Sequence, residues 1–144
     1  MVSTALAFAR ACDREGYKYE DPRDVGDKGK TDVTLGVSGS AGNSYKVRFI
    51  FDEDGESVAV RVFSFVKANN DSYAKLLVLC NQLNDKYRWV KFVIDDDKDL
   101  NIEADCVITE RTAGTVCCEM FGHFMSIAKK AYPEFMKAIW GGQG

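Results

Sequence analysis

Apolar residues recur at the spacing of an α-helix over the last part of the chain, from Cys117 to Phe135. The series consists of Cys117, Met120, Phe121, Phe124, Ala128, Ala131 and Phe135. Further apolar residues widen the arc of this helix to about 200 degrees, whereas a stripe of roughly 100 degrees is enough to pack on one sheet. These are Val116, Cys118, Met125, Ile127 and Tyr132. We therefore expect something besides a sheet to cover this helix, and Pro133 to bend or restart it.

Two hydrophobic periods divide the rest of the chain. Alternating apolar residues are typical of strands with one buried face, and apolar residues three and four apart indicate helices. Turn-forming Gly, Asp, Asn and Ser separate these segments. The predicted elements are a helix at 1–14, strands at 31–37, 45–51 and 57–66, a helix at 73–87, strands at 89–94 and 100–108, and the last helix from 115. This α-βββ-α-ββ-α order predicts an α+β domain with an antiparallel sheet flanked by helices.

The composition indicates one domain, residues 1–144. The hydrophobic fraction is 46% and the aromatic fraction 12%, with two prolines in 144 residues. These values are those of a globular chain that can bury a full core, and they differ from those of disordered chains.

The charge distribution argues against nucleic-acid binding. The net charge is −3, and the basic residues Lys28 and Lys30 lie among aspartates in segment 20–30, which has the composition of a solvated loop. The N-terminal residues lack the pattern of a signal peptide, and no segment approaches the roughly 20 apolar residues of a membrane span. We therefore expect a cytoplasmic protein that contacts neither nucleic acid nor membrane.

The residue types that most often carry chemistry show no catalytic or metal-binding spacing. The five cysteines lack the paired spacing of a disulfide framework or a zinc site. The single histidine, His123, shares the last helix with Cys117 and Cys118, but neither lies one turn away. The acidic runs 52–55 and 95–99 lie between strands without the spacing of a calcium-binding EF-hand loop, which favours hairpin turns. The sequence predicts no catalytic residue, no metal and no cofactor.

Two asparagines stand near the end of the apolar helix 73–87. Its apolar face is predicted to contain Tyr73, Leu76, Leu77, Cys80, Leu83 and Tyr87. Asparagine readily ties its amide to nearby backbone, so a structural role is favoured for Asn81 and Asn84. The alternative is a ligand pocket between this helix and the sheet, because such pockets combine apolar walls with a few polar groups. Its lining would be Tyr73, Asn81, Asn84 and Trp89.

Six segments of the chain together form a recognisable pattern. They are Gly16-Tyr17-Lys18-Tyr19, the strand from Tyr45 to Phe51, Asp52-Glu53-Asp54, Leu79-Cys80-Asn81-Gln82-Leu83-Asn84, Lys91-Phe92-Val93-Ile94-Asp95 and Tyr132-Pro133-Glu134-Phe135. This pattern resembles the YbjN-type domain family, whose members are described as bacterial sensory transduction regulators. The six segments extend over nearly the whole chain and consist of core and turn residues. The resemblance therefore bears on the fold more than on any chemistry.

The resemblance implies an architecture like that of the type III secretion chaperones, with frequent dimerisation and binding of extended segments of partner proteins. We therefore expect a non-enzymatic protein-binding module, chaperone-like or regulatory, that forms a homodimer and binds a protein partner. The wide apolar arc of the last helix suggests that Val116, Met120 and Ile127 form the dimer or partner surface. The alternative is a small-ligand sensor or enzyme that uses the pocket between the second helix and the sheet.

Overall fold

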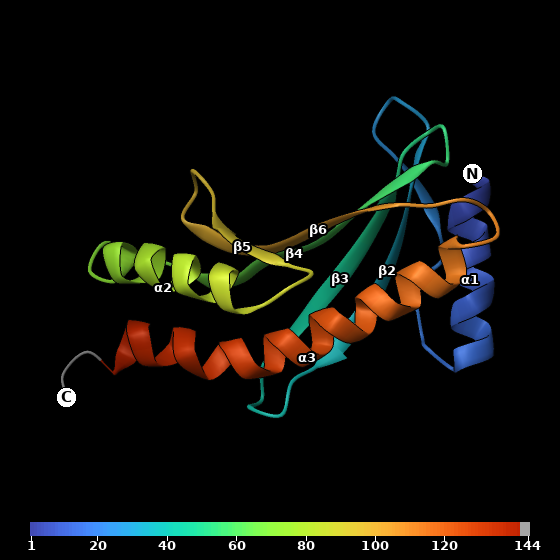
Figure 1. Ribbon diagram of the computed structural model, residues 1–144. Coiled ribbons are helices and arrows are strands. Elements are labelled where there is room, and N and C mark those ends of the chain that lie inside the picture. Colours follow the sequence, from blue (N-terminus) through green and yellow to red (C-terminus); the bar gives the residue numbers. More distant parts are fainter. Residues whose placement is uncertain (142–144) are drawn as a thin grey trace.

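The computed structural model of the protein describes residues 1–141 (Figure 1). The elements are α1 (Ser3–Glu15), β1 (Arg23–Val25), β2 (Lys30–Ser38), β3 (Ser44–Phe51), β4 (Ser57–Lys67), α2 (Tyr73–Lys86), β5 (Lys91–Ile94), β6 (Asp99–Val107) and α3 (Ala113–Trp140). The strands form one six-stranded antiparallel sheet in the order β1-β2-β3-β4-β6-β5. The predicted α+β class and its order of elements are confirmed, with β1 as an additional strand.

Strand β1 lies inside the segment that was expected to be a solvated loop. Its three residues pair with β2, so that Arg23 lies opposite Asp32 and Asp24 opposite Thr31. Just before β1, the backbone N–H of Glu20 donates to the carbonyl of Thr34 at 2.9 Å. This strand could not be predicted from the sequence. Backbone pairing needs no apolar side chains, and three residues are too few to show an alternation of apolar and polar residues.

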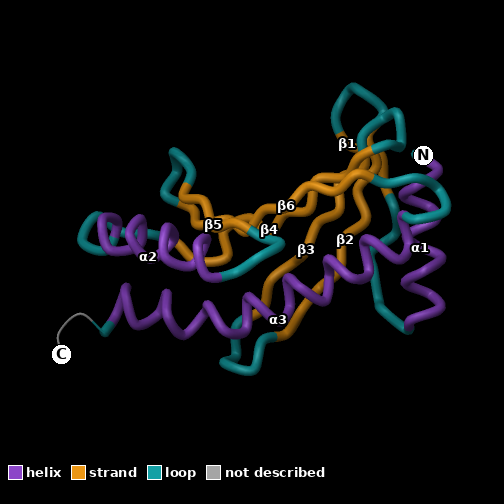
Figure 2. Tube along the Cα trace, viewed as in Figure 1, coloured by secondary structure: helices purple, strands orange, loops and turns teal. Residues whose placement is uncertain are grey.

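One face of the sheet is covered by helices and the other is open (Figure 2). Helix α3 runs across the sheet, α1 lies against α3 and β2, and α2 lies beside β5. The residues of β2, β3, β4 and β6 that point toward the helices are almost entirely buried. They include Val33, Leu35, Val47, Phe49, Phe51, Val58, Val60, Val62, Leu100 and Ile102. This pattern is that of an antiparallel sheet with one apolar face and one solvated face.

Helix α1 covers the first turns of α3, and α2 contacts α3 as well. A Cβ placed on Gly114 would lie 2.9 Å from the Cβ of Ala11, so the two helices cross in close contact there. Beyond the end of α1, the ring of Tyr17 packs edge-on against Phe121 with centroids 5.1 Å apart. The expectation that something besides the sheet covers this helix is confirmed, and the cover belongs to the same chain.

Helix α3 continues through Pro133 to Trp140 as one helix. Proline removes one backbone hydrogen bond, but Ala131 and Phe135 on either side of it are fully buried and hold both parts of the helix against the core. The expected restart therefore does not occur. Within the described range, no helix combines the length and apolar character needed to cross a membrane.

Candidate functional site

The predicted dimer surface on α3 needs correction, because most of it is buried within one chain. Met120 is 9% exposed and Ile127 is 6% exposed, and both belong to the core cluster. Val116 is half-buried and packs against the same core. The prediction did not allow for cover by the rest of the chain, whereas α1 and α2 contact α3 in addition to the sheet. Met120 and Ile127 are therefore not available to a partner.

The four residues of the predicted ligand pocket do not converge on one cavity. Trp89 is 56% exposed, adopts a positive φ of 80°, and stacks on His123 with ring centroids 4.7 Å apart. Tyr73 is half-buried, with the Nζ of Lys98 6.0 Å from its ring centroid. Asn81 is exposed to solvent on α2. These different surroundings contradict a shared pocket between α2 and the sheet.

Asn84 has the structural role that was favoured, and it acts on the edge of the sheet. Its Oδ1 accepts from the backbone N–H of Phe92 at 2.7 Å, and its Nδ2 donates to the carbonyl of Phe92 at 3.1 Å. Phe92 lies in β5, the last strand of the sheet. The side-chain amide thus pairs with the free edge as a neighbouring strand would, which ties α2 to β5 and protects the edge.

Replacing Asn84 by alanine is expected to lower the free energy of unfolding by about 1–2 kcal/mol, because two backbone groups of Phe92 lose their partner. Gln82→Ala is the matched control, since Gln82 is exposed on the same helix and alanine is a good helix former. The control should change stability by no more than about 0.5 kcal/mol. Urea unfolding of both variants measures the difference, and equal stabilities would contradict the role of Asn84.

Several ion pairs lie on the open face of the sheet. Among residues 1–141, the ion pairs are Arg23–Asp32, Lys30–Asp52, Lys46–Glu20, Arg48–Asp32, Arg61–Asp105, Lys67–Asp99 and Lys91–Glu103. Alternation along the strands places the strand residues of these pairs on the face opposite the buried core residues. Because the charges satisfy one another, this face is typical of a solvated surface more than of an interface.

The acidic turn between β5 and β6 is held by its own hydrogen bonds. One oxygen of Asp95 accepts from the backbone N–H groups of Asp97 and Asp99, and the other accepts from the amide of Asn101. The Asn101 bond, followed by that from Asp99, holds the pKa of Asp95 below its usual range. Carboxylate oxygens of Asp95, Asp97 and Asp99 lie within 4.8 Å of one another. Hydrogen bonding within the turn accounts for this grouping, as the hairpin interpretation predicts.

The thiols are suited to packing. Burial raises the pKa of Cys12 to about 12 and that of Cys80 to about 11, and burial also raises the pKa of Cys117. A thiol with such a pKa stays protonated at neutral pH, whereas the thiolate is the nucleophile and the metal ligand. These three cysteines therefore behave as small apolar core residues.

Helix α2 has a second apolar surface that the chain leaves uncovered. Its inner face buries Leu76, Cys80 and Leu83. On the opposite side Leu77 is 44% exposed and Val78 is 59% exposed. Exposed Ala74 and Asn81 continue this side one turn before and one turn after. We call Ala74, Leu77, Val78 and Asn81 the α2 stripe; all four side chains are uncharged and follow the helical spacing of one face.

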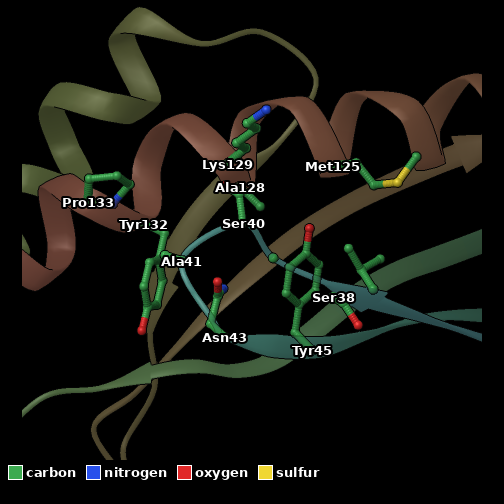
Figure 3. Close-up of a pocket in the computed structure, with 12 residues that line it drawn as sticks. Ser38, Ser40, Ala41, Asn43, Tyr45, Met125, Ala128, Lys129, Tyr132 and Pro133 are labelled. Atoms are coloured by element: carbon green, nitrogen blue, oxygen red, sulfur yellow. The ribbon is translucent and has the colours of Figure 1, made fainter.

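A cavity of about 310 Å³ lies between α3 and the turn that joins β2 to β3 (Figure 3). It is lined by Val37, Ser38, Gly39, Ser40, Ala41, Asn43, Tyr45, Met125, Ala128, Lys129, Tyr132 and Pro133. We call it the hairpin cavity. Sequence analysis missed this site because its lining comes from two segments some eighty residues apart, and neither carries a recognisable motif.

Comparisons with known proteins identify relatives of this fold. The family described as "YbjN: Putative bacterial sensory transduction regulator" matches residues 7–137. Among solved structures, the chain is similar to one described as "Crystal structure of YbjN, a putative transcription regulator from E. coli". The TM-score is 0.60 at 10% sequence identity, over 90% of this chain and 92% of that chain. No curated protein matches the chain by sequence.

The structural likeness, at 10% identity, concerns the fold alone. The family match is independent of it and extends from α1 to the last turns of α3. It also agrees with the resemblance found in the core and turn segments of the sequence. The chain belongs to the YbjN family.

Proposed function

We propose that this protein is a non-enzymatic regulatory module that acts by binding protein chains through the α2 stripe. The regulatory part of the proposal is supported by the descriptions of the family and of the E. coli structure. The binding part depends on one observation, the exposed apolar side chains of Leu77 and Val78 on a helix whose other face is already packed. An amphipathic helix needs only one apolar face to dock on its own domain. A second uncharged face is a surface for another chain.

The first occupant of the stripe is a second copy of this chain. The stripe positions 74, 77, 78 and 81 have the same spacing read in either direction. In an antiparallel two-fold pair of α2 helices, Leu77 of each copy therefore faces Val78 of the other, and Ala74 faces Asn81. Two-fold dimers require such a self-complementary patch. The stripe brings no like charges together at its centre, which favours this pairing.

Trp140 adds apolar area beside α2. It is 74% exposed and lines a shallow cavity together with Lys75 of α2. Tryptophan is among the residue types that contribute most to binding energy at interfaces. An interface centred on α2 can therefore extend over the end of α3.

Addition of an extended partner segment to the edge of the sheet is less favoured than helix packing. The edge strand β5 has four residues, and the side chain of Asn84 already occupies the backbone groups of Phe92. The other edge strand, β1, has only three residues. Short or covered edges are the means by which proteins avoid strand addition.

Replacing Leu77 and Val78 by aspartate is expected to convert a dimer into a monomer. A carboxylate buried without a partner at an interface costs several kcal/mol, so two per chain should weaken association by at least roughly 100-fold. Sedimentation velocity over a range of protein concentrations measures the change. The folded state should persist, since both positions are exposed in the single chain.

Val107→Asp is the matched control, because Val107 is 87% exposed on the open face of the sheet. It introduces one negative charge away from the α2 stripe and should leave the association unchanged. A wild-type chain that stays monomeric at high micromolar concentration would contradict the homodimer. A control that dissociates as completely as the double variant would place the interface elsewhere.

A further inference from the structure

The hairpin cavity has rigid aromatic walls. Tyr45 on β3 and Tyr132 on α3 both line it, and Figure 3 shows their rings with Asn43 between them. Behind them, the buried ring of Phe65 packs edge-on against Tyr45 at 5.3 Å and against Tyr132 at 5.6 Å. The shared contact fixes both tyrosines relative to one another. Flat apolar walls of this kind suit a flat ligand.

The polar groups of the cavity are free to bind a ligand. Within residues 1–141, the hydroxyl groups of Tyr45 and Tyr132 make no hydrogen bond to another residue of the chain, and the ammonium of Lys129 has no ion-pair partner. Burial raises the pKa of Tyr45, so its hydroxyl stays protonated and can donate. The hydroxyl groups of Ser38 and Ser40 add further donors at the mouth of the turn.

The charge of the lining favours an anion. Lys129 is the only charged residue among the lining residues, and no aspartate or glutamate accompanies it. This is unusual for a chain whose net charge is −3. Figure 3 shows the ammonium of Lys129 turned away from the tyrosine rings, so this exposed, flexible side chain has to turn inward to reach a ligand. A carboxylate would find one cation and several hydroxyl donors, whereas an amine would find no anionic partner.

The cavity volume limits the size of the ligand. Sites for small molecules generally measure about 300–1,000 Å³, and the hairpin cavity, at about 310 Å³, lies at the lower end. A compound with one or two rings suits this volume.

We infer that the hairpin cavity binds a small aromatic carboxylate, with its ring against the walls formed by Tyr45 and Tyr132 and its carboxylate at Lys129. The inference does not depend on the proposed role of the α2 stripe, which lies on another helix. It gives the protein a ligand-sensing site at a place different from the pocket predicted between α2 and the sheet. A bound ligand would join the β2–β3 turn to α3, since the lining comes from both.

The test uses three probes that differ in charge but share a ring, namely phenylacetate, phenylacetamide and phenethylamine. Two-dimensional ¹H–¹⁵N NMR of the full chain follows each titration into the millimolar range. Phenylacetate is expected to shift the amide signals of residues 37–45 and 125–133 in a saturable way. The neutral amide should bind about tenfold more weakly and the amine more weakly still, because a charge-assisted contact is worth somewhat more than a neutral one.

Two variants of α3 test the charge of Lys129 and the aromatic wall of Tyr132 separately. Lys129→Gln should lower the affinity for phenylacetate about tenfold and leave that for phenylacetamide unchanged. Tyr132→Leu should weaken both probes. Lys130→Gln is the matched control, because Lys130 is exposed, adjacent in sequence and absent from the lining.

Three outcomes would overturn the inference: no saturable shift with phenylacetate, equal affinities for the three probes, or an equal loss in Lys129→Gln and Lys130→Gln. Leu77→Asp with Val78→Asp keeps the test independent of the proposed function, since this variant should bind phenylacetate as the wild type does. If this variant stayed folded but no longer bound phenylacetate, the hairpin cavity would be coupled to the α2 stripe, and the two proposals would not be independent.

Discussion

Replacing Phe8 by alanine is expected to lower the free energy of unfolding by about 3–5 kcal/mol, the usual cost of removing a buried phenylalanine ring. Phe8 is fully buried on the inner side of α1. Its ring centroid lies 4.4 Å from that of Phe49 and 6.1 Å from that of Phe51, both in β3. The truncation would leave a cavity where α1 meets the sheet, and close-packed surroundings relax only partly to fill such a cavity.

Leu6→Ala is the matched control for this helix. Leu6 is 37% exposed, so its truncation should cost no more than about 1 kcal/mol. Urea unfolding followed by circular dichroism gives both values. If Phe8→Ala proved as mild as Leu6→Ala, α1 would not be firmly docked.

The periodicity of the sequence predicted the elements well because each pattern reflects a local rule. Alternation in β3 and β4 follows from the geometry of a strand, and the 3.6-residue period of α3 follows from that of a helix. Gly16, with a φ of 77°, ends α1 close to the predicted end of this helix at residue 14, because glycine readily adopts the left-handed conformation of a helix end. The local rules do not state which elements meet. For that reason the burial of Met120 and Ile127 within the chain could not be predicted, and the predicted dimer surface was wrong.

The second helix shows where the sequence held more information than was used. Leu77 was assigned to the same face as Leu76 and Cys80, yet it is 44% exposed. At 100 degrees per residue, Leu77 and Val78 point away from the centre of the buried face, so the α2 stripe could have been recognised from the sequence. The hairpin cavity could not, because no pattern shows that the turn after β2 lies against α3. For Asn84, the sequence predicted a hydrogen bond from its amide to backbone but not that the partner would be Phe92 in the edge strand.

Replacing Arg48 by methionine is expected to destabilise the protein by about 2–4 kcal/mol, because it leaves the carboxylate of Asp32 without its main partner. The side chain of Asp32 is fully buried although it lies on the open face of the sheet. Its Oδ2 accepts from Nε of Arg48 at 2.8 Å and from Nη2 at 2.6 Å. Without Arg48 there remain the hydroxyl of Thr34 at 2.8 Å and the exposed guanidinium of Arg23 at 3.7 Å.

Lys46→Met is the matched control on the same strand and face. Lys46 and its partner Glu20 are both more than half exposed, so this pair should contribute no more than about 1 kcal/mol. A second variant tests the cause. In the Arg48→Met background, Asp32→Asn should recover part of the lost stability, because a neutral amide is less costly to bury than a carboxylate.

Urea unfolding of the wild type, Arg48→Met, Lys46→Met and the double variant Arg48→Met with Asp32→Asn separates three explanations of the result. A loss that Asp32→Asn partly recovers identifies the unpaired charge as its cause. A loss that remains in the double variant would instead reflect the packing of the Arg48 guanidinium, which lies 5.4 Å from the ring centroid of Phe63. If Arg48→Met lowered the free energy of unfolding no more than Lys46→Met does, the carboxylate of Asp32 would be hydrated in solution. In the first case the pair links β2 to β3 and, through Arg23, to β1, so a buried charge stabilises the one strand that the sequence did not predict.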